Sequence, residues 1–482
     1  MPALVIQGCD ALVAPDEVHR SVDLLMDDGR IAAIEPTGRR EPPSGAEVVS
    51  GDGLLAMPGL VNAHTHSPEN CLRGSGEGLP LEVWLTRMFG TAGAFSPEDH
   101  YVCALAGAVE MLLTGTTAAL DHLWMTPPSV PAAEAVLRAY RDCGIRAAVA
   151  PLVADVDFTE ALAAERGLDV SGALFTDLAP PLSADEAQAQ LEELLGRWHD
   201  RDARRLQVLA GPCGVQWCSD ELLVRLAETA RRHDTALTMH LLETALQGEV
   251  CRLRFGDTAV RGLDQLGLLS PRCSLAHSVW IEPRDIELIA DRGAIVVHNP
   301  AANFRLGSGR APIPDLMDAG ARIALGADGS ASSDNQIMWT QLKLAALIHN
   351  GDRDRWVSGA RALEMATAGG AAALGLAGQL GRIEAGALAD VVLLDRRGEG
   401  LMGVQEISAG LALSETGRGV VHVLVAGEFV VRDRRCTRVD EKALRTAIAE
   451  QAAKRREHQE AVPRPTLEAM DKMARLRSAR VE

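Results

Sequence analysis

The chain has 482 residues, of which 47% are hydrophobic and 24% charged, and its formal net charge is −18. This length suits one large core with an accessory module, and the acidic excess argues against a nucleic-acid partner, which needs a basic surface. Residues 1–8 lack the basic and apolar stretches of a signal peptide, and no apolar run is long enough to span a membrane. The nine cysteines have no paired spacing, which favours reduced thiols and a cytoplasmic protein.

Residues 1–57 have the pattern of short strands joined by turns, with Asp27-Asp28-Gly29 as a hairpin signal. A similar strand-rich pattern returns over residues 381–439. The two segments are able to pair in one small β-sandwich. Two separate β-modules are an equally fair interpretation of the sequence alone.

Between these segments, residues 58–380 alternate apolar strands with amphipathic helices, which predicts an α/β fold with a parallel sheet covered by helices. Together with the strand that ends at His64 we count eight strands, which favours a (β/α)8 TIM barrel. A doubly wound open sheet is less favoured, because no Gly-x-Gly-x-x-Gly turn follows an early strand. The other strands are expected at Thr117–Leu120, Ala147–Val153, Leu206–Leu209, Leu237–Met239, Cys273–Ala276, Ala294–Val297 and Ile323–Leu325. Helices between them are expected at Pro97–Thr114, Ala132–Cys143, Asp220–His233 and Pro283–Arg292.

Two segments stand apart from this alternation. Residues 154–182 form a long stretch punctuated by Pro and Gly, and loops of that length are usually functional or disordered. A loop that covers the substrate and plain surface decoration fit this stretch equally well. Residues 440–482 are rich in Glu, Lys, Arg and Ala, which predicts a solvated helix that packs on the barrel or on a neighbouring subunit. We expect a homo-oligomer, a dimer or a tetramer.

The stretch 57–66 ends in two histidines separated by one residue, His64 and His66. Alternate residues of a strand share one face, so the two imidazoles are able to converge on one point. Neutral imidazoles held in this way bind Zn²⁺ or Fe²⁺. An isolated His-x-His is more often a pair of exposed side chains, but the polar residues at later strand ends favour the metal site.

Those later strand ends carry His240, His277 and Asp328. In (β/α)8 barrels the reactive groups project from the C-terminal ends of the strands. His64, His66, His240 and Asp328 therefore make a chemically sensible ligand set for one divalent metal ion together with a water. His277 is either a further imidazole ligand or a neighbour of that water. A lone buried histidine is more often a core residue, so the prediction rests on the set.

The sequence Pro58-Gly59-Leu60-Val61-Asn62-Ala63-His64-Thr65-His66 resembles the first barrel strand of the amidohydrolase superfamily, in its branch of cytosine- and adenosine-deaminase-like enzymes. The resemblance extends over nearly the whole chain. The chain resembles triazine hydrolases and 8-oxoguanine deaminases, with S-adenosylhomocysteine deaminases as further relatives. It implies a barrel over 58–380, a composite β-sandwich domain from 1–57 and 381–439, and a helical segment over 440–482. The later matching motifs are Thr238–Thr244, Ala276–Ser278, Val297–Pro300 and Gly326–Ser332.

The resemblance also implies roles for single residues. Glu243 would act as general acid/base, Asp328 would receive the proton of the attacking water, and His277 would touch that water without ligating the metal. Without the family, Glu243 is as readily a carboxylate at a helix start. Binuclear members bridge their metals with a carboxylated lysine, and this chain has no lysine before Lys343. We therefore expect one metal ion, Zn²⁺ or Fe²⁺, although Cys213 offers a less favoured route to a second.

Weaker candidates for substrate contact lie around the same strand ends, and ordinary packing is at least as common for each. Cys213 stands where nucleoside deaminases of the superfamily carry a histidine that touches the purine. Those relatives also carry a carboxylate after the Trp84-Leu85 position that binds the ribose hydroxyls. This chain has no acid there, and Glu82 is the nearby carboxylate that could take its place. These departures favour a free heterocyclic base or triazine over a nucleoside. The candidate substrate contacts are Trp84, His122, Cys213, Gln216, Trp217, His298 and Asn303.

The sequence thus predicts a metal-dependent hydrolase, most simply a deaminase of an amino-substituted nitrogen heterocycle. One alternative keeps the fold and the metal but cleaves a C–Cl, C–S, alkylamino, amide or urea bond, or deaminates a nucleoside. Another alternative is a non-catalytic assembly protein with a relic barrel. The intact set of His64, His66, His240, Glu243 and Asp328 argues against the relic.

Overall fold

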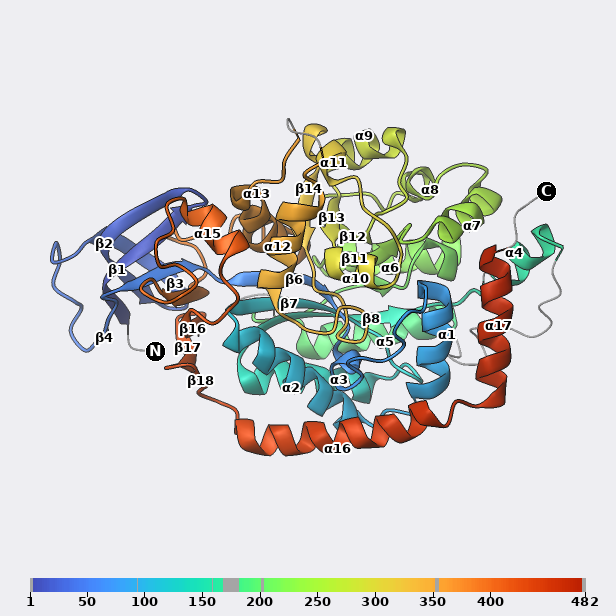
Figure 1. The fold of residues 1–482 in the computed structure, drawn as a ribbon, viewed down its shortest axis with the longest axis horizontal. Coiled ribbons are helices and arrows are strands. Elements are labelled where there is room, and N and C mark those ends of the chain that lie inside the picture. Colours follow the sequence, from blue (N-terminus) through green and yellow to red (C-terminus); the bar gives the residue numbers. More distant parts are fainter. Residues whose placement is uncertain are drawn as a thin grey trace.

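The computed structural model describes residues 3–92, 94–157, 159–167, 182–200, 203–351 and 355–478. It places a sheet drawn from both chain ends beside a set of parallel strands that helices surround (Figure 1). The helices within the described ranges are all too short or too polar to cross a membrane.

Among the described residues, nine strands form one mixed sheet in the order β18-β17-β16-β15-β5-β1-β2-β3, with β4 beside β1. The two chain ends meet where β5 pairs antiparallel with β15, and Ala56 lies opposite Leu393. This sheet has an apolar core of its own, which includes Ile6 and Leu24. Both strand-rich segments therefore share one sheet. The strands are β1 (Leu4–Ala14), β2 (Glu17–Asp27), β3 (Arg30–Pro36), β4 (Glu47–Ser50), β5 (Leu54–Pro58), β15 (Val391–Asp395), β16 (Val420–Val425), β17 (Glu428–Arg432) and β18 (Arg435–Cys436).

The middle of the chain forms two parallel sheets. One contains β6 (Leu60–Thr65), β7 (Thr116–Leu123), β8 (Arg146–Val153), β9 (Leu206–Val208) and β10 (Gly211–Pro212). The other contains β11 (Leu237–Leu241), β12 (Cys273–His277), β13 (Ile295–His298) and β14 (Arg322–Leu325). Isolated parallel bridges pair Ala210 with Leu237 and Gly214 with His240, which joins the sheets at one edge. At the other edge the backbone N–H of Asp328 donates to the carbonyl of His64 at 2.8 Å. The first and the last strand therefore end side by side.

Helices lie between these strands, and local signals set their ends. Ser96 and Asp99 form a capping box at the start of α2, and Gly115 with φ +86° follows its end, as the turn requires. Residues 158 and 168–181, part of the expected substrate-covering segment, lie outside the described residues. The helices are α1 (Leu81–Ala92), α2 (Pro97–Leu113), α3 (Val130–Cys143), α4 (Thr159–Glu165), α5 (Ala184–Trp198), α6 (Asp220–Arg232), α7 (Ala245–Phe255), α8 (Ala259–Gln265), α9 (Pro283–Arg292), α10 (Pro300–Arg305), α11 (Ile313–Asp318), α12 (Met338–Ile348), α13 (Gly359–Glu364), α14 (Gly370–Ala373) and α15 (Ile407–Leu413).

The tail expected as one solvated helix is two helices, α16 (Glu441–Glu460) and α17 (Arg464–Ser478). They are separated at Pro463, which has no N–H to continue a helix. In Figure 1, α16 runs along α2 and α17 stands beside α1. Met473 and Leu476 of α17 are fully buried in an apolar cluster with α1 and α7, so one face of this helix packs on the rest of the chain, as expected, while its other face is exposed.

One buried ion pair connects the parallel strands to the sheet of the chain ends. Arg146, at the start of β8, donates from Nε and Nη2 to the carboxylate of Asp390 at 2.9 and 2.8 Å, and both side chains are fully buried. The Arg146 Nη1 group donates to the carbonyls of Ala203 and Arg204 at 3.1 and 2.7 Å. The pair is bidentate and its remaining donors are satisfied, which is the geometry that makes a buried pair tolerable.

Replacing one partner of this pair is expected to be costly. Arg146→Met leaves the Asp390 carboxylate buried without its cation, and we expect the free energy of unfolding to fall by about 3–5 kcal/mol. Urea denaturation measures the change. Arg397→Met is the matched control, because its partner Asp52 and Arg397 itself are 79% and 71% exposed, and its expected cost is at most about 1 kcal/mol. Equal costs for the two variants would contradict the structural role of Arg146.

Candidate metal centre and substrate cavity

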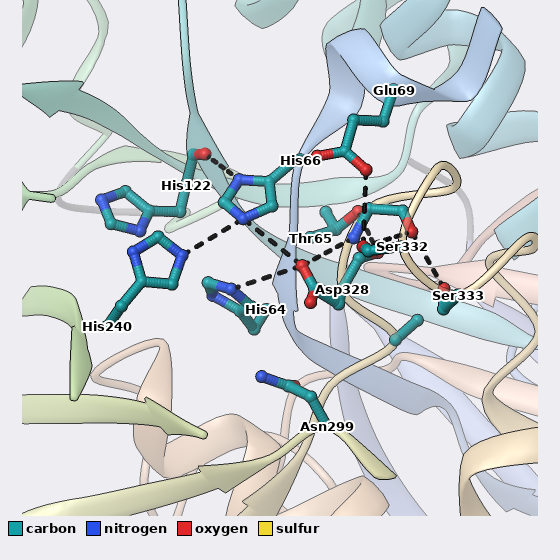
Figure 2. A network of polar contacts seen from close by, with 12 residues as sticks. His64, Thr65, His66, Glu69, His122, His240, Asn299, Asp328, Ser332 and Ser333 are labelled. Atoms are coloured by element: carbon teal, nitrogen blue, oxygen red, sulfur yellow. Dashed lines mark hydrogen bonds and ion pairs between the residues drawn. The ribbon is translucent and has the colours of Figure 1, made fainter. Parts of the chain in front are cut away.

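The residues expected as metal ligands converge at the ends of β6, β11 and β14 (Figure 2). His66 Nε2 lies 3.3 Å from Asp328 Oδ1 and 3.2 Å from His240 Nε2. His64 Nε2 lies 3.7 Å from Asp328 Oδ1. The possible ligand atoms form two overlapping groups, His64 with His240 and His277, and His64 with His66 and Asp328, each within 4.8 Å. The structure therefore brings together all four expected ligands, with His277 beside them.

Hydrogen bonds at the outer ring nitrogens direct two imidazoles inward. His66 Nδ1 lies 2.5 Å from the carbonyl of His122, and His240 Nδ1 lies 2.6 Å from the carbonyl of Cys213. A carbonyl only accepts, so each Nδ1 carries the proton and each Nε2 presents its lone pair to the centre. Both ring nitrogens of His64 are buried without a partner in the described part of the chain. A buried polar atom without a partner is unusual, and a metal ion would satisfy it.

Burial favours the neutral form of His64 and His240. It lowers the pKa of His64 well below its ordinary value, and the nearby His66 lowers it further. Burial lowers the pKa of His240 in the same way, with His122 as the next cause. Neutral imidazole is the form that binds metal. Three neutral imidazoles and one carboxylate fit a divalent ion such as zinc.

His277 stands between two carboxylates. Its Nε2 lies 3.6 Å from Glu243 Oε2 and 3.9 Å from Asp328 Oδ2, and its Nδ1 lies 2.8 Å from Asn303 Oδ1. His277 and Asp328 have φ angles of 72° and 63°, which residues other than glycine rarely adopt. Such backbone costs about 1–3 kcal/mol and is typical of sites held for function.

Glu243 follows β11 and is buried, with only 4% of its surface exposed. Its Oε1 accepts from the Ser308 hydroxyl at 3.0 Å, and its backbone N–H donates to Gln247 Oε1 at 2.9 Å. Burial raises the pKa of the Glu243 carboxyl, while the nearby His277 lowers it. The carboxyl is thus held at a fixed position beside His277, within reach of a substrate at the centre.

A cavity opens onto this centre. Apolar side chains, four of them aromatic, and the polar side chains of the site line it together. The apolar side chains are Leu81, Trp84, Leu85, Met88, Phe89, Trp124, Leu152, Ala154, Val156, Trp217 and Leu306. The polar side chains, with Cys213, are His66, Glu69, Gln216, His240, Glu243, Gln247, His277, Asp328 and Ser332.

Four of the seven expected substrate contacts line this cavity, namely Trp84, Cys213, Gln216 and Trp217. Trp84 Nε1 and Gln216 Nε2 are buried donors without a hydrogen-bond partner among the described residues. Burial raises the pKa of the Cys213 thiol well above its usual range.

The other three expected contacts do not line the cavity within the described ranges. His122 stacks on His240 with ring centroids 4.8 Å apart. His298 Nε2 lies 3.1 Å from the Nε2 of His349, and Asn303 binds His277. Their contact with substrate stays a prediction, and the structure gives each of them a neighbouring side chain as partner.

Glu82, the substitute expected for holding a ribose, is also occupied. It accepts from the Thr244 hydroxyl and forms an ion pair with Arg477 of α17. It is buried and does not line the cavity that the described residues form. A sugar in this cavity would find Glu69, Glu243 and Asp328 as its carboxylates, and the last two already face the metal centre.

The sequence reasoning missed Glu69. This residue lies in the 3₁₀ helix η1 (Ser67–Cys71), three residues after His66, and its carboxylate reaches the cavity on the side of Asp328 away from His240 (Figure 2). Burial raises its pKa to about 7, against the opposing effect of His66. The spacing His-x-His-x-x-Glu was the available signal, but Glu69 is not at a strand end.

Known proteins are similar to this chain over most of its length. The amidohydrolase family model matches residues 55–430. A 5-methylthioadenosine/S-adenosylhomocysteine deaminase of Syntrophobacter fumaroxidans is 32% identical over 439 residues, which cover 86% of this chain and 94% of that protein. A 5'-deoxyadenosine deaminase of Methanothermobacter thermautotrophicus is 32% identical over 454 residues, which cover 94% of this chain and 98% of that protein.

Solved structures are similar over nearly the same length. Atrazine chlorohydrolase from Arthrobacter aurescens TC1, complexed with zinc, superposes with a TM-score of 0.83 at 28% identity and covers 93% of this chain and 100% of its own. An adenosine deaminase from Xanthomonas campestris with bound zinc gives a TM-score of 0.81 at 27% identity, covering 94% and 98%. The sequence motifs, the converging side chains and these likenesses agree: the chain belongs to the amidohydrolase family.

Proposed function

We propose that this chain is a divalent-metal-dependent deaminase that replaces an exocyclic amino group of a nitrogen heterocycle by a hydroxyl group, with water consumed and ammonia released. The observation that carries the proposal is the position of Glu243, whose Oε2 lies 3.6 Å from His277 Nε2 in the cavity that also contains Asp328. The two deaminase relatives at 32% identity support this reaction class.

His64, His66, His240 and Asp328 would hold a divalent metal ion. That ion would supply Lewis acidity for the activation of a water molecule. Asp328 Oδ2 accepts one proton of the attacking water, whose oxygen bonds to the ring carbon. Glu243 Oε2 delivers its proton to the ring nitrogen, takes it back as the ring regains its aromaticity, and passes it to the departing amine. His277, fixed by Asn303, donates or accepts at Nε2 between these two carboxylates.

The cavity favours a flat ring without a sugar. Trp84, Phe89 and Trp124 offer aromatic surface to a planar heterocycle. Gln216 Nε2, a buried donor without a partner among the described residues, suits a ring nitrogen or a carbonyl oxygen. Because Glu82 is engaged by Arg477, we propose a free heterocyclic base or triazine as the substrate.

The test is a hydrolysis panel with zinc-loaded protein. It contains adenine, guanine, a pterin, 2-amino-1,3,5-triazine, adenosine and 5'-methylthioadenosine, and it records ammonia release and ultraviolet absorbance. We expect ammonia from at least one free ring, with a higher kcat/KM than for either nucleoside. A panel without ammonia would contradict the deaminase. Faster turnover of the nucleosides would keep the deaminase and overturn the free-ring substrate.

A second candidate is dechlorination of a chlorotriazine, which the similarity to atrazine chlorohydrolase supports. The same water attack displaces chloride, and Glu243 then protonates the ring nitrogen alone. Chloride release from a chlorotriazine in the same panel separates this reaction from deamination.

We further propose that the strands of residues 58–380 close a (β/α)8 barrel, supported by the contacts at both edges of the two parallel sheets. Residues 1–57 and 381–439 would make the composite β-sandwich domain beside it, and 440–482 the helical segment. One Zn²⁺, with Fe²⁺ as the alternative, is the proposed cofactor. The nine free cysteines support a cytoplasmic location, and a homo-oligomer stays a prediction.

A further inference from the structure

Glu69 is a second carboxylate beside Asp328, on the opposite side from Glu243. It is 2% exposed and lines the cavity. Glu69 lies near His66 and Asp328, whereas Glu243 Oε2 lies 3.6 Å from His277 Nε2, which in turn lies 3.9 Å from Asp328 Oδ2. The two glutamates therefore flank Asp328, one on the His66 side and one on the His277 side. A ring bound at the centre would meet both.

The chain is built to hold this carboxylate in place. The backbone N–H of Ala331 donates to Glu69 Oε2 at 3.1 Å, and the Ser332 hydroxyl donates to the same atom at 3.4 Å (Figure 2). The Trp124 side chain lies beside the carboxyl and lowers its pKa against the effect of burial. A Cβ atom at position 329 would lie 1.9 Å from Oε2, so only glycine lets this loop approach Glu69 so closely.

The role of Glu69 differs from those already assigned. It belongs to neither group of possible metal ligands in the described part of the chain. No lysine or arginine of the described ranges forms an ion pair with it. A carboxylate has about four acceptor positions, and the two donors from Ala331 and Ser332 leave room for another. A buried carboxylate without a cation is costly unless further donors reach it, and the cavity is where such a donor enters.

We propose that Glu69 is a specificity-determining residue that accepts a hydrogen bond from a second N–H group of the substrate. The substrate class is then a ring with two amino or alkylamino substituents in 1,3-relation, such as a diaminotriazine or a diaminopyrimidine. One substituent leaves with the proton that Glu243 supplies, and the other binds Glu69. The loss of one amino group rests on the proposed deaminase function. The binding of the other group to Glu69 does not, because binding requires no turnover.

Binding to zinc-loaded Glu243→Gln protein, in which turnover is slow, tests this step by calorimetry. The probes are 2,4-diamino-1,3,5-triazine and 2-amino-1,3,5-triazine, which differ by one amino group. A hydrogen bond to a charged acceptor predicts about tenfold or stronger binding of the diamino ring. Glu69→Gln in the same background is expected to remove most of this preference. Glu82→Gln, a buried glutamate that faces Arg477 and not the cavity, is the matched control and should retain it.

A comparison between ligands keeps the test valid if the Glu69 variant does not fold. The two ligands are 2-amino-1,3,5-triazines with a 4-methylamino group, which keeps one N–H, or a 4-dimethylamino group, which has none. Only the dimethylamino ligand should lose the stronger binding over the monoamino ring. A preference that survives Glu69→Gln in zinc-loaded protein, or equal binding of the two alkylated rings, would overturn the role of Glu69. Failure of both triazines to bind would overturn it as well. A diamino ring that binds through Glu69 but releases no ammonia with unmodified protein would overturn the deaminase alone.

Discussion

Glu243→Gln is expected to keep the metal and to lose about 10²–10⁴-fold in kcat. The amide has the same shape, so the hydrogen bond from Ser308 and the contact with His277 remain possible. It cannot deliver a proton to the ring nitrogen or to the leaving amine. Steady-state kinetics on the best substrate of the panel, with zinc content measured on the same samples, gives the result.

The control for this variant is Glu228→Gln, the same substitution at an exposed glutamate of α6. It should leave both kcat and the zinc content at their normal values. If Glu243→Gln turned over substrate at nearly the normal rate with full zinc, the proton transfer would have to be assigned to another residue. Loss of zinc together with activity would instead make Glu243 a part of the metal centre.

His240→Ala is expected to lose both the metal and the activity. The imidazole of His240 points its Nε2 at the centre, 3.2 Å from His66 Nε2, and alanine offers no donor atom. With His64, His66 and Asp328 remaining, the site keeps two imidazoles and one carboxylate, which bind zinc more weakly than the full set. Elemental analysis should find one zinc per unmodified chain and far less in the variant.

His458→Ala, at an exposed position of α16, is the matched control and should retain one zinc and full activity. Two equivalents of zinc in the unmodified protein, both needed for activity, would contradict the single-metal site. Full zinc in His240→Ala would show that the imidazole of His240 is not a ligand.

The sequence determined those features that depend on near neighbours in the chain. The His64-x-His66 spacing places two imidazoles on one face of a strand, because side chains of a strand alternate. Strand ends marked by His240, His277 and Asp328 lie together in the structure, because the C-terminal ends of parallel strands meet at one rim. The helix α9 matches its predicted bounds, since Pro283 and Gly293 mark its ends.

Only the tertiary structure decided the contacts between residues far apart in the chain. Glu69 is held by Ala331 and Ser332, about 260 positions away, and no local pattern encodes that distance. The engagement of Glu82 by Arg477 has the same origin. Likewise, β5 pairs antiparallel with β15, so the two strand-rich segments form one shared sheet and not two separate modules. Pairing between strands far apart in the sequence depends on the whole packed chain and not on either segment.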